Sequence, residues 1–355
     1  NVNSPTSTIS GLPQNPPGGA AISTNIRWTV TSALGVCSAQ TDDVLLTVNS
    51  LPVVNNQTPQ LCEDVAGGGS QAGFNLTTLN ASITGGAPGV TVESFADPVP
   101  VSPILPATTP QIISNGAGGT YFVRLNTPIG CQNTGTVTFT VNTLPSAVDK
   151  NLEFCENTLG AGIATGINLT SFEFGATGVT NGGTAANRNV EWYEDAGLTT
   201  LIPAGAGVGQ EQNYTITATK TVFAKVIDIT SPVTPDCYDV ADVVLTLRLR
   251  PVNNPIVGSG TVCTHPTNVV LYQINPATNP GSNFTWSVSG TATFQIFGGG
   301  GTNSANFFIL LRFPGPTTGT VNIDVFETLN NCTGNTSSMS VTVAGAPGAL
   351  TFDNP

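Results

Sequence analysis

The chain repeats one short pattern four times, at intervals close to the length of a small β-domain. In each copy a Thr lies five residues before a Pro, and apolar residues alternate with other residues around it. Such period-two alternation is typical of a half-buried strand. Each copy is therefore predicted to be the closing strand of a repeat, over residues 44–48, 137–141, 243–247 and 339–343, before Pro52, Pro145, Pro251 and Pro347.

The four Pro residues divide the chain into repeats of 93, 106 and 96 residues, which is the size of one β-sandwich. We expect tandem β-sandwich domains of an all-β chain at 52–144, 145–250 and 251–346. Residues 1–51 are expected to be the C-terminal part of a preceding repeat, and 347–355 the start of a following one. Short junctions that contain Pro restrict the backbone, so an elongated, semi-rigid rod is expected.

The seven Cys residues occupy two fixed positions relative to these Pro residues. Late Cys residues precede the Pro by 14 or 15 residues, and early ones follow it by 10 to 12. The late set is Cys37, Cys131, Cys237 and Cys332, and the early set is Cys62, Cys155 and Cys263. Pairing across the junctions would give 37 with 62, 131 with 155 and 237 with 263, and free thiols in a reducing compartment are a further alternative.

We favour disulfides within each repeat, namely Cys62–Cys131, Cys155–Cys237 and Cys263–Cys332. The first and last strands of a seven-stranded sandwich run the same way, which is expected to bring both Cys residues of one repeat to similar heights. Each bridge would stabilise its repeat by roughly 4 kcal/mol on the chain-entropy model. The partner of Cys37 is then expected outside this chain, either upstream or in a second chain that donates a strand.

Individual strands within the repeats are also predicted. Residues 119–125 and 221–226 match each other as penultimate strands, and 74–79 and 167–172 match as second strands. Trp192 and Trp286 lie near the middle of their repeats, where a large ring fills the space between two sheets.

Charged residues make up only 8% of the chain, and the net charge is −12. With nine basic residues the chain is a poor ligand for nucleic acid, whose binding requires Lys and Arg at phosphates. The longest apolar run is five residues, so no membrane span is expected. No targeting signal is visible at Asn1, which indicates an interior or processed piece.

Catalytic, cofactor-binding and metal-ligating residues are not predicted, and the chain is not expected to be an enzyme. The one His, His265, is expected in an exposed turn. Three acidic clusters are the candidates for calcium, but none fits a known loop pattern, so they are expected to be solvated. These clusters are Glu63-Asp64, Glu194-Asp195, and Asp236 with Asp239 and Asp242.

The repeats resemble the PKD-like and immunoglobulin-like repeats of giant secreted adhesins of gliding Bacteroidota. Residues 283–290 (Asn-Phe-Thr-Trp-Ser-Val-Ser-Gly), with Cys332 after Asn-Asn, are similar to the PKD-like version. Residues 191–195 (Glu-Trp-Tyr-Glu-Asp), with Cys237-Tyr-Asp-Val, are similar to the immunoglobulin-like version. The repeat at 52–144 departs from both because it lacks the Trp.

This resemblance implies type IX secretion, anchoring at the outer membrane, and a filament used in cell adhesion or gliding motility. Its expected partners are neighbouring repeats of the same giant chain, other filament chains, and surface glycans or a substratum. Two alternatives are an array of carbohydrate-binding modules, with Tyr193 as a candidate exposed aromatic, and accessory domains of a secreted hydrolase.

Overall fold

The chain forms β-sandwiches in tandem, as the sequence predicted. The computed structural model describes residues 8–114, 119–231, 233, 236–274 and 280–346, so the predicted start of a following repeat at 347–355 lies outside the described residues. Contacts divide the chain into two compact units. The first unit contains residues 1–146 together with 227–239, and the second contains 147–226 and 240–355.

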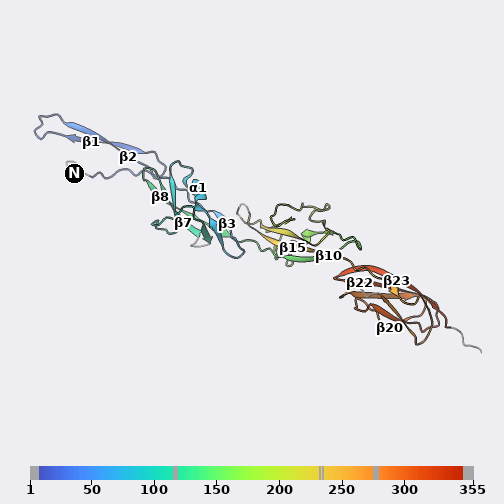
Figure 1. Cartoon of the computed structure of the whole chain (residues 1–355). Coiled ribbons are helices and arrows are strands. Elements are labelled where there is room, and N and C mark those ends of the chain that lie inside the picture. Colours follow the sequence, from blue (N-terminus) through green and yellow to red (C-terminus); the bar gives the residue numbers. More distant parts are fainter. Residues whose placement is uncertain (1–7, 115–118, 232, 234–235, 275–279, 347–355) are drawn as a thin grey trace, which may run out of the picture. The chain divides into compact units, whose positions relative to one another are not determined.

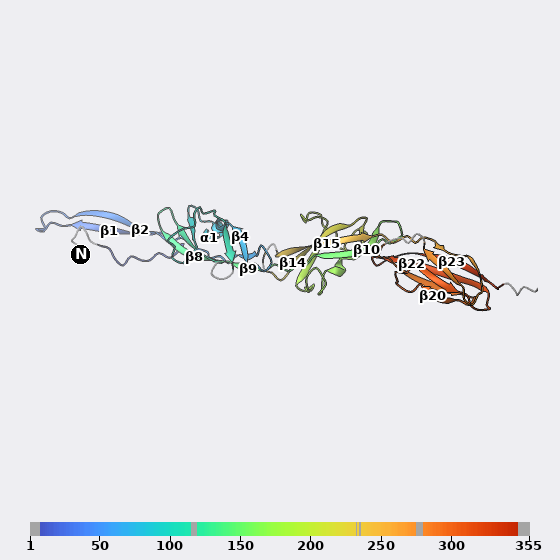
Figure 2. The same cartoon turned by 60° about the horizontal axis from the view of Figure 1, so that its bottom comes forward.

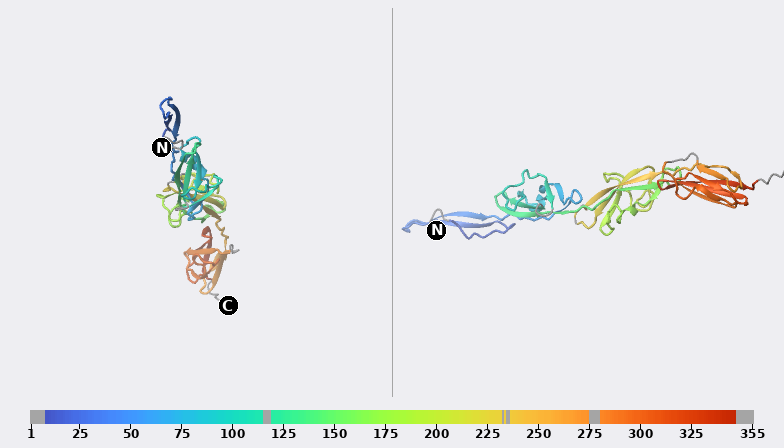
Figure 3. Two further views of the ribbon diagram at one scale, coloured as in Figure 1. Left: turned by 90° about the vertical axis from the view of Figure 1, so that its left-hand side faces the viewer. Right: turned by 90° about the horizontal axis from the view of Figure 1, so that it is seen from below.

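The first unit begins with an antiparallel hairpin, drawn in blue as a two-stranded ribbon (Figure 3). Its strands are β1 (Ile22–Val30) and β2 (Gln40–Val48). Ile26 pairs with Val44 on one face, and Arg27 pairs with Asp43 on the other, where they form an ion pair. The apolar face is open to solvent, since Val44 is 58% exposed.

A sandwich follows in the same unit, and its strands form one sheet in the order β5-β7-β8 and pairs β3-β9 and β4-β6. Its core includes Ile113, Leu125 and Val137, each at most 1% exposed. The elements are β3 (Gln60–Cys62), β4 (Ser70–Phe74), the 3-10 helix η1 (Leu76–Leu79), α1 (Asn80–Thr84), β5 (Thr91–Phe95), β6 (Gln111–Ser114), β7 (Thr120–Asn126), β8 (Gln132–Thr138) and β9 (Thr140–Asn142).

The next sandwich packs a four-stranded sheet, in the order β10-β15-β14-β12, against the pair β11-β13. Trp192 is fully buried in its core, as predicted, and Figure 2 labels the parallel neighbours β10 and β15. Its elements are β10 (Lys150–Cys155), β11 (Ala164–Ile167), the 3-10 helix η3 (Leu169–Phe172), β12 (Arg188–Tyr193), β13 (Tyr214–Ile216), β14 (Lys220–Asp228) and β15 (Tyr238–Arg248).

The last sandwich has two four-stranded sheets, in the orders β17-β23-β22-β19 and β16-β18-β21-β20, and Figure 1 labels β20, β22 and β23 among its strands. Trp286 lies in its core and donates from Nε1 to the carbonyl of Asn306 at 2.9 Å. The strands are β16 (Ile256–Val257), β17 (Thr261–Cys263), β18 (Val269–Ile274), β19 (Asn283–Gly290), β20 (Gln295–Gly299), β21 (Phe308–Arg312), β22 (Gly319–Leu329) and β23 (Cys332–Ala344).

The predicted closing and penultimate strands are present, but the predicted second strands are wrong. β4 ends at Phe74 and β11 ends at Ile167, and at both places the chain then forms a 3-10 helix. Asn75 and Asn168 cap these helices, because each side-chain oxygen accepts a hydrogen bond from the amide two residues later. The Asn-Leu-Thr pattern mimics strand alternation, yet its Asn favours a helix start.

Candidate functional site at the repeat junctions

Each early Cys ends the first strand of its sandwich, and this strand runs parallel to the last one. The early Cys stands opposite a residue three positions before the junction Pro in every repeat. These pairs are Cys62 with Asn142, Cys155 with Arg248, and Cys263 with Ala344. The early Cys and the junction Pro therefore lie at the same end of the sandwich.

Each late Cys lies instead where the last strand begins. Cys332 is the first residue of β23, and Cys237 immediately precedes β15. A strand rises about 3.3 Å per residue, so the 11 residues from Cys237 to Arg248 place Cys237 roughly 36 Å from the level of Cys155. The two Cys residues of one repeat thus occupy opposite ends of their sandwich.

The predicted disulfides within repeats (62–131, 155–237 and 263–332) are therefore wrong. The structure joins Cys62 to Cys237 and Cys155 to Cys332, each with 5.5 Å between Cα atoms. The parallel course of the first and last strands was predicted correctly, but one Cys ends its strand and the other begins its strand. Each bridge thus links the Cys that ends the first strand of one sandwich to the Cys at the start of the last strand of the following sandwich.

The two bridges interleave along the sequence. Cys155 lies inside the loop that Cys62–Cys237 closes, and Cys237 lies inside the loop that Cys155–Cys332 closes. Cys37 and Cys263 are exposed free thiols, and Cys131 is a free thiol that is partly exposed.

A buried carboxylate follows each bridged early Cys. Glu63 is 3% exposed and accepts backbone hydrogen bonds from Gly67 at 2.8 Å, Gly69 at 2.7 Å and Leu144 at 2.9 Å. Leu144 is the residue before the junction Pro145, so the carboxylate ties the end of the repeat to its own loop. Gly67 and Gly69 have positive φ angles of 75° and 64°, which favour Gly because it has no Cβ.

The same arrangement recurs at the next junction. Glu156 is 1% exposed and accepts from the amides of Gly160 at 3.0 Å, Gly162 at 2.7 Å and Arg250 at 2.9 Å. Arg250 precedes Pro251, and its guanidinium also donates to the carbonyls of Glu156 at 2.7 Å and Thr333 at 2.9 Å. We call Glu63 and Glu156, with their three amides each, the carboxylate clamps.

Both clamps hold their carboxylates in the ionised form. Burial alone would raise the pKa of Glu63, but the amides of Gly69, Gly67 and Leu144 together outweigh it and hold that pKa below its ordinary value. For Glu156 the amides of Gly162 and Gly160 are the main cause of a lowered pKa. Glu63 was predicted to be a solvated loop charge, and that prediction is wrong. Glu156 was not singled out from the sequence.

The third junction uses a hydroxyl in the same place. Thr264 follows Cys263, and its Oγ1 accepts a hydrogen bond of 3.1 Å from the amide of Ala346, the residue before Pro347. One neutral acceptor here replaces a carboxylate that binds three amides. The sequence signal for a clamp is Cys-Glu followed by Gly at four and six residues after the Glu, which residues 62–69 and 155–162 share.

The other candidate groups serve local structure. His265 is exposed and its Nδ1 accepts from the amides of Thr267 and Asn268, each at 3.2 Å. Glu194 binds Lys220 and accepts from the Tyr214 hydroxyl, while Asp195 accepts from the amides of a turn. Within the described ranges, no three His, Cys, Asp or Glu residues are grouped so that they could hold a metal ion.

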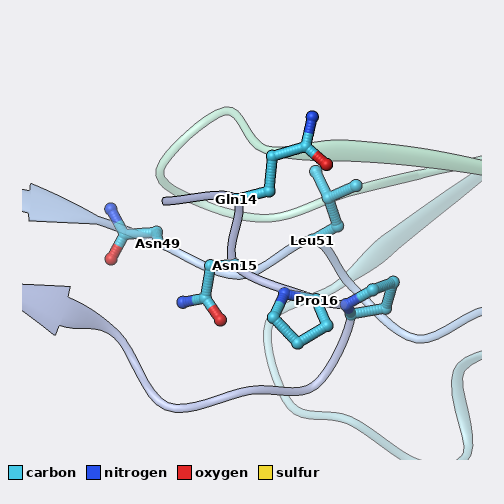
Figure 4. Close-up of a pocket in the computed structure, with 6 residues that line it drawn as sticks. Gln14, Asn15, Pro16, Asn49 and Leu51 are labelled. Atoms are coloured by element: carbon cyan, nitrogen blue, oxygen red, sulfur yellow. The ribbon is translucent and has the colours of Figure 1, made fainter. Parts of the chain in front are cut away.

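A hollow beside β1 and β2 is lined by six residues, none of them titratable, and Asn15 in it donates to the carbonyls of Ala20 and Val48 (Figure 4). Tyr193 is half-buried and its hydroxyl donates to Glu191 at 2.8 Å. In the part of the chain that is described, no helix is long and apolar enough to span a membrane.

No protein-family model matches the chain, and no curated protein matches it. Among solved structures, it is similar to fibronectin(III)-like modules of Clostridium thermocellum CbhA, with 12% identity over 59% of this chain and 96% of that chain and a TM-score of 0.30.

Two other similar structures are an I-band fragment of titin and the PKD domain of human KIAA0319. The titin fragment has 11% identity over 84% of this chain and 97% of that chain, with a TM-score of 0.26. The PKD domain has 18% identity over 29% of this chain and 93% of that chain, with a TM-score of 0.21. At these TM-scores the likenesses carry no argument about function.

Proposed function

We propose that the chain is a structural and adhesive segment of a long extracellular surface filament. The observation that carries the proposal is the pair of interleaved disulfides, each of which crosses a predicted repeat boundary. Disulfides persist in oxidising, extracellular surroundings and not in a reducing cytosol. A chain whose consecutive domains are bonded covalently is suited to transmit load, and its work is mechanical.

The carboxylate clamps support the same role. Each one fixes the last residue before the junction Pro by a charge-assisted hydrogen bond, so the junction has little freedom to swivel. Pro itself restricts the neighbouring backbone. Together these contacts favour a stiff spacer, and an elongated rod made of such repeats would hold an adhesive end away from the cell.

The hairpin β1–β2 is proposed to be the closing hairpin of another sandwich. Val44 is 58% exposed, whereas Val137 at the equivalent place in the next repeat is 1% exposed. Ile26, Trp28 and Val44 lie on the same face as each other, which is the face that the other closing hairpins turn toward their cores. The repeat boundaries at Pro52, Pro145 and Pro251 are part of this proposal.

The finer assignment rests on the sequence resemblance. It supports a giant adhesin of a gliding Bacteroidota cell, exported by type IX secretion, anchored at the outer membrane and used in attachment or gliding motility. Its proposed partners are neighbouring repeats, other filament chains, and surface glycans or a substratum.

Surface labelling of the source cells tests the proposal. Antibodies against residues 52–346, attached to gold particles, are expected to decorate filaments on intact cells, and an in-frame deletion of these residues is expected to reduce attachment to glass. Label confined to the interior of opened cells, or unchanged attachment by the deletion strain, would rule out the adhesive filament.

A further inference from the structure

The three early Cys residues are presented by the same backbone geometry, although one of them is free. The amide of the following residue donates to the carbonyl opposite the Cys in each repeat. These bonds are Glu63 to Asn142 at 2.9 Å, Glu156 to Arg248 at 2.9 Å, and Thr264 to Ala344 at 2.8 Å. The exposed thiol of Cys263 thus has the placement that Cys62 and Cys155 have when bridged.

The late Cys residues also share one position, at the end of the hairpin before the last strand. The carbonyl of Cys131 accepts from Thr127 at 2.9 Å, that of Cys237 accepts from Asp228 at 2.9 Å, and Cys332 pairs with Leu329. The bridged residues Cys237 and Cys332 are each 1% exposed. Cys131 is free and only half-buried, which is the difference that a missing partner would make.

Both observed bridges follow one rule, from the early Cys of a repeat to the late Cys of the next repeat, at sequence separations of 175 and 177 residues. We propose that Cys131 and Cys263 are attachment sites for further repeats, bonded by the same rule. Cys131 takes the early Cys of the repeat before it, and Cys263 takes the late Cys of the repeat after it. Cys37, at the late position, takes an early Cys in the same way.

The chemistry is ordinary thiol–disulfide exchange. Two thiols lose two protons and two electrons, one S–S bond forms, and the disulfide of a thiol oxidoreductase accepts the electrons and becomes a dithiol. The adjoining repeat can belong to the same chain or to a second copy. This inference rests on the tandem-array part of the proposed function and is independent of adhesion. Thiol mapping therefore tests the pairing rule, and the attachment assay tests the adhesive role, each without the other.

The native secreted protein tests the rule directly. It is alkylated without reduction, digested, and searched for disulfide-linked peptides. We expect Cys131 joined to a Cys about 10 residues after a junction Pro, and Cys263 joined to a Cys about 14 residues before one, spacings that follow from the sequence. Migration as a single chain before reduction would assign the partner to the same chain, and a ladder of larger species would assign it to a second copy.

Either source supports the inference. Recovery of Cys131 or Cys263 as alkylated thiols, or bonded to a Cys of its own repeat, would overturn it.

A tandem chain provides a second measurement. In it residues 1–346 are followed directly by 52–355, so that Cys263 of the first copy and Cys131 of the second copy lie in adjoining repeats. Thiol titration of the folded chain is expected to find three thiols, and five would contradict the rule.

The matched control is the same tandem chain with Cys263→Ser in its first copy. It removes one proposed partner and leaves every observed bridge intact. We expect it to expose the thiol of Cys131 in the second copy, so that the count rises from three to four and the peptide of that Cys131 becomes alkylated. An unchanged peptide pattern at Cys131 would count against the rule.

Discussion

The junctions after residues 144 and 250 differ from the junction after residue 346 in the residue that follows the early Cys and in the state of that Cys. At the first two, Glu63 and Glu156 gather three amides each and follow a Cys that is bridged to the next repeat. At the third, Thr264 accepts one amide and follows a free Cys. The clamp and the bridge thus occur together at the first two junctions.

The largest effect is expected from breaking a bridge. Cys155→Ser frees Cys332 and opens a loop of 177 residues, which the chain-entropy model values at about 5 kcal/mol for unfolding of the whole loop. Denaturant unfolding of the variant should fall between oxidised and reduced wild type, because the variant keeps Cys62–Cys237 and reduction breaks both bridges. Cys263→Ser is the matched control, since Cys263 is free in this chain and its substitution should leave the unfolding curve unchanged.

Removal of a clamp should have the next largest effect. Glu63→Ala leaves the amides of Gly67, Gly69 and Leu144 without their acceptor, so the variant should lose about 2 to 3 kcal/mol. Glu63→Gln keeps one acceptor oxygen and should lose less. A stability equal to wild type in both variants would show that the clamp contributes nothing to folding.

The ionised clamps predict a dependence on pH. The pKa of Glu156 is lowered by folding, so its contribution to stability is complete above the ordinary Glu value near 4.5 and is lost as the pH falls through the lower folded value. Glu156→Gln should therefore flatten the loss of stability in acid. Thermal unfolding at pH 3 and pH 7 measures this, and an unaltered acid profile would contradict it.

Glu173, in the same sandwich as Glu156, has a pKa that is shifted in the opposite direction. Burial raises its pKa to about 6, partly offset by the hydrogen bond that the Trp192 indole donates at 2.9 Å. Its contribution is complete below pH 4.5 and is lost as the pH rises to about 6, so Glu173→Gln should stabilise the protein at pH 7 by roughly 1 kcal/mol after solvent screening. The stability difference between Glu173→Gln and wild type is measured at pH 4 and pH 7. A smaller gain at pH 7 than at pH 4 would contradict this prediction.

The smallest effect is expected at the third junction. Thr264→Ala removes the one acceptor for the amide of Ala346, and the expected loss is about 1 kcal/mol or less. Comparison with Glu63→Ala, by denaturant unfolding under the same conditions, sharpens the contrast between the two kinds of junction. Equal losses in both variants would remove the distinction between them.

The fold could be predicted because strand alternation and Pro spacing are local signals that repeat. The Cys pairing could not, because it depends on which end of each strand carries the Cys, and a prediction of parallel strands leaves that open. Glu63 was misjudged for a related reason: a charged residue beside Asp64 resembles loop charge until the amides of Gly67, Gly69 and Leu144 are placed around it. The segments after Asn75 and Asn168 were wrongly predicted as strands, because one capping side chain at each place starts a 3-10 helix inside an alternating pattern.

Single-molecule stretching of the chain between its ends tests most directly whether the repeats are covalently joined. The bridges leave three parallel segments between Cys62 and Cys332, namely 62 to 155 (93 residues), 155 to 237 (82) and 237 to 332 (95). The shortest one limits full unfolding of this segment to roughly 280 Å. Reduction should release about 270 residues and roughly 920 Å. An extension that reaches the longer value without reductant would contradict the interleaved bridges and the mechanical role that is proposed from them.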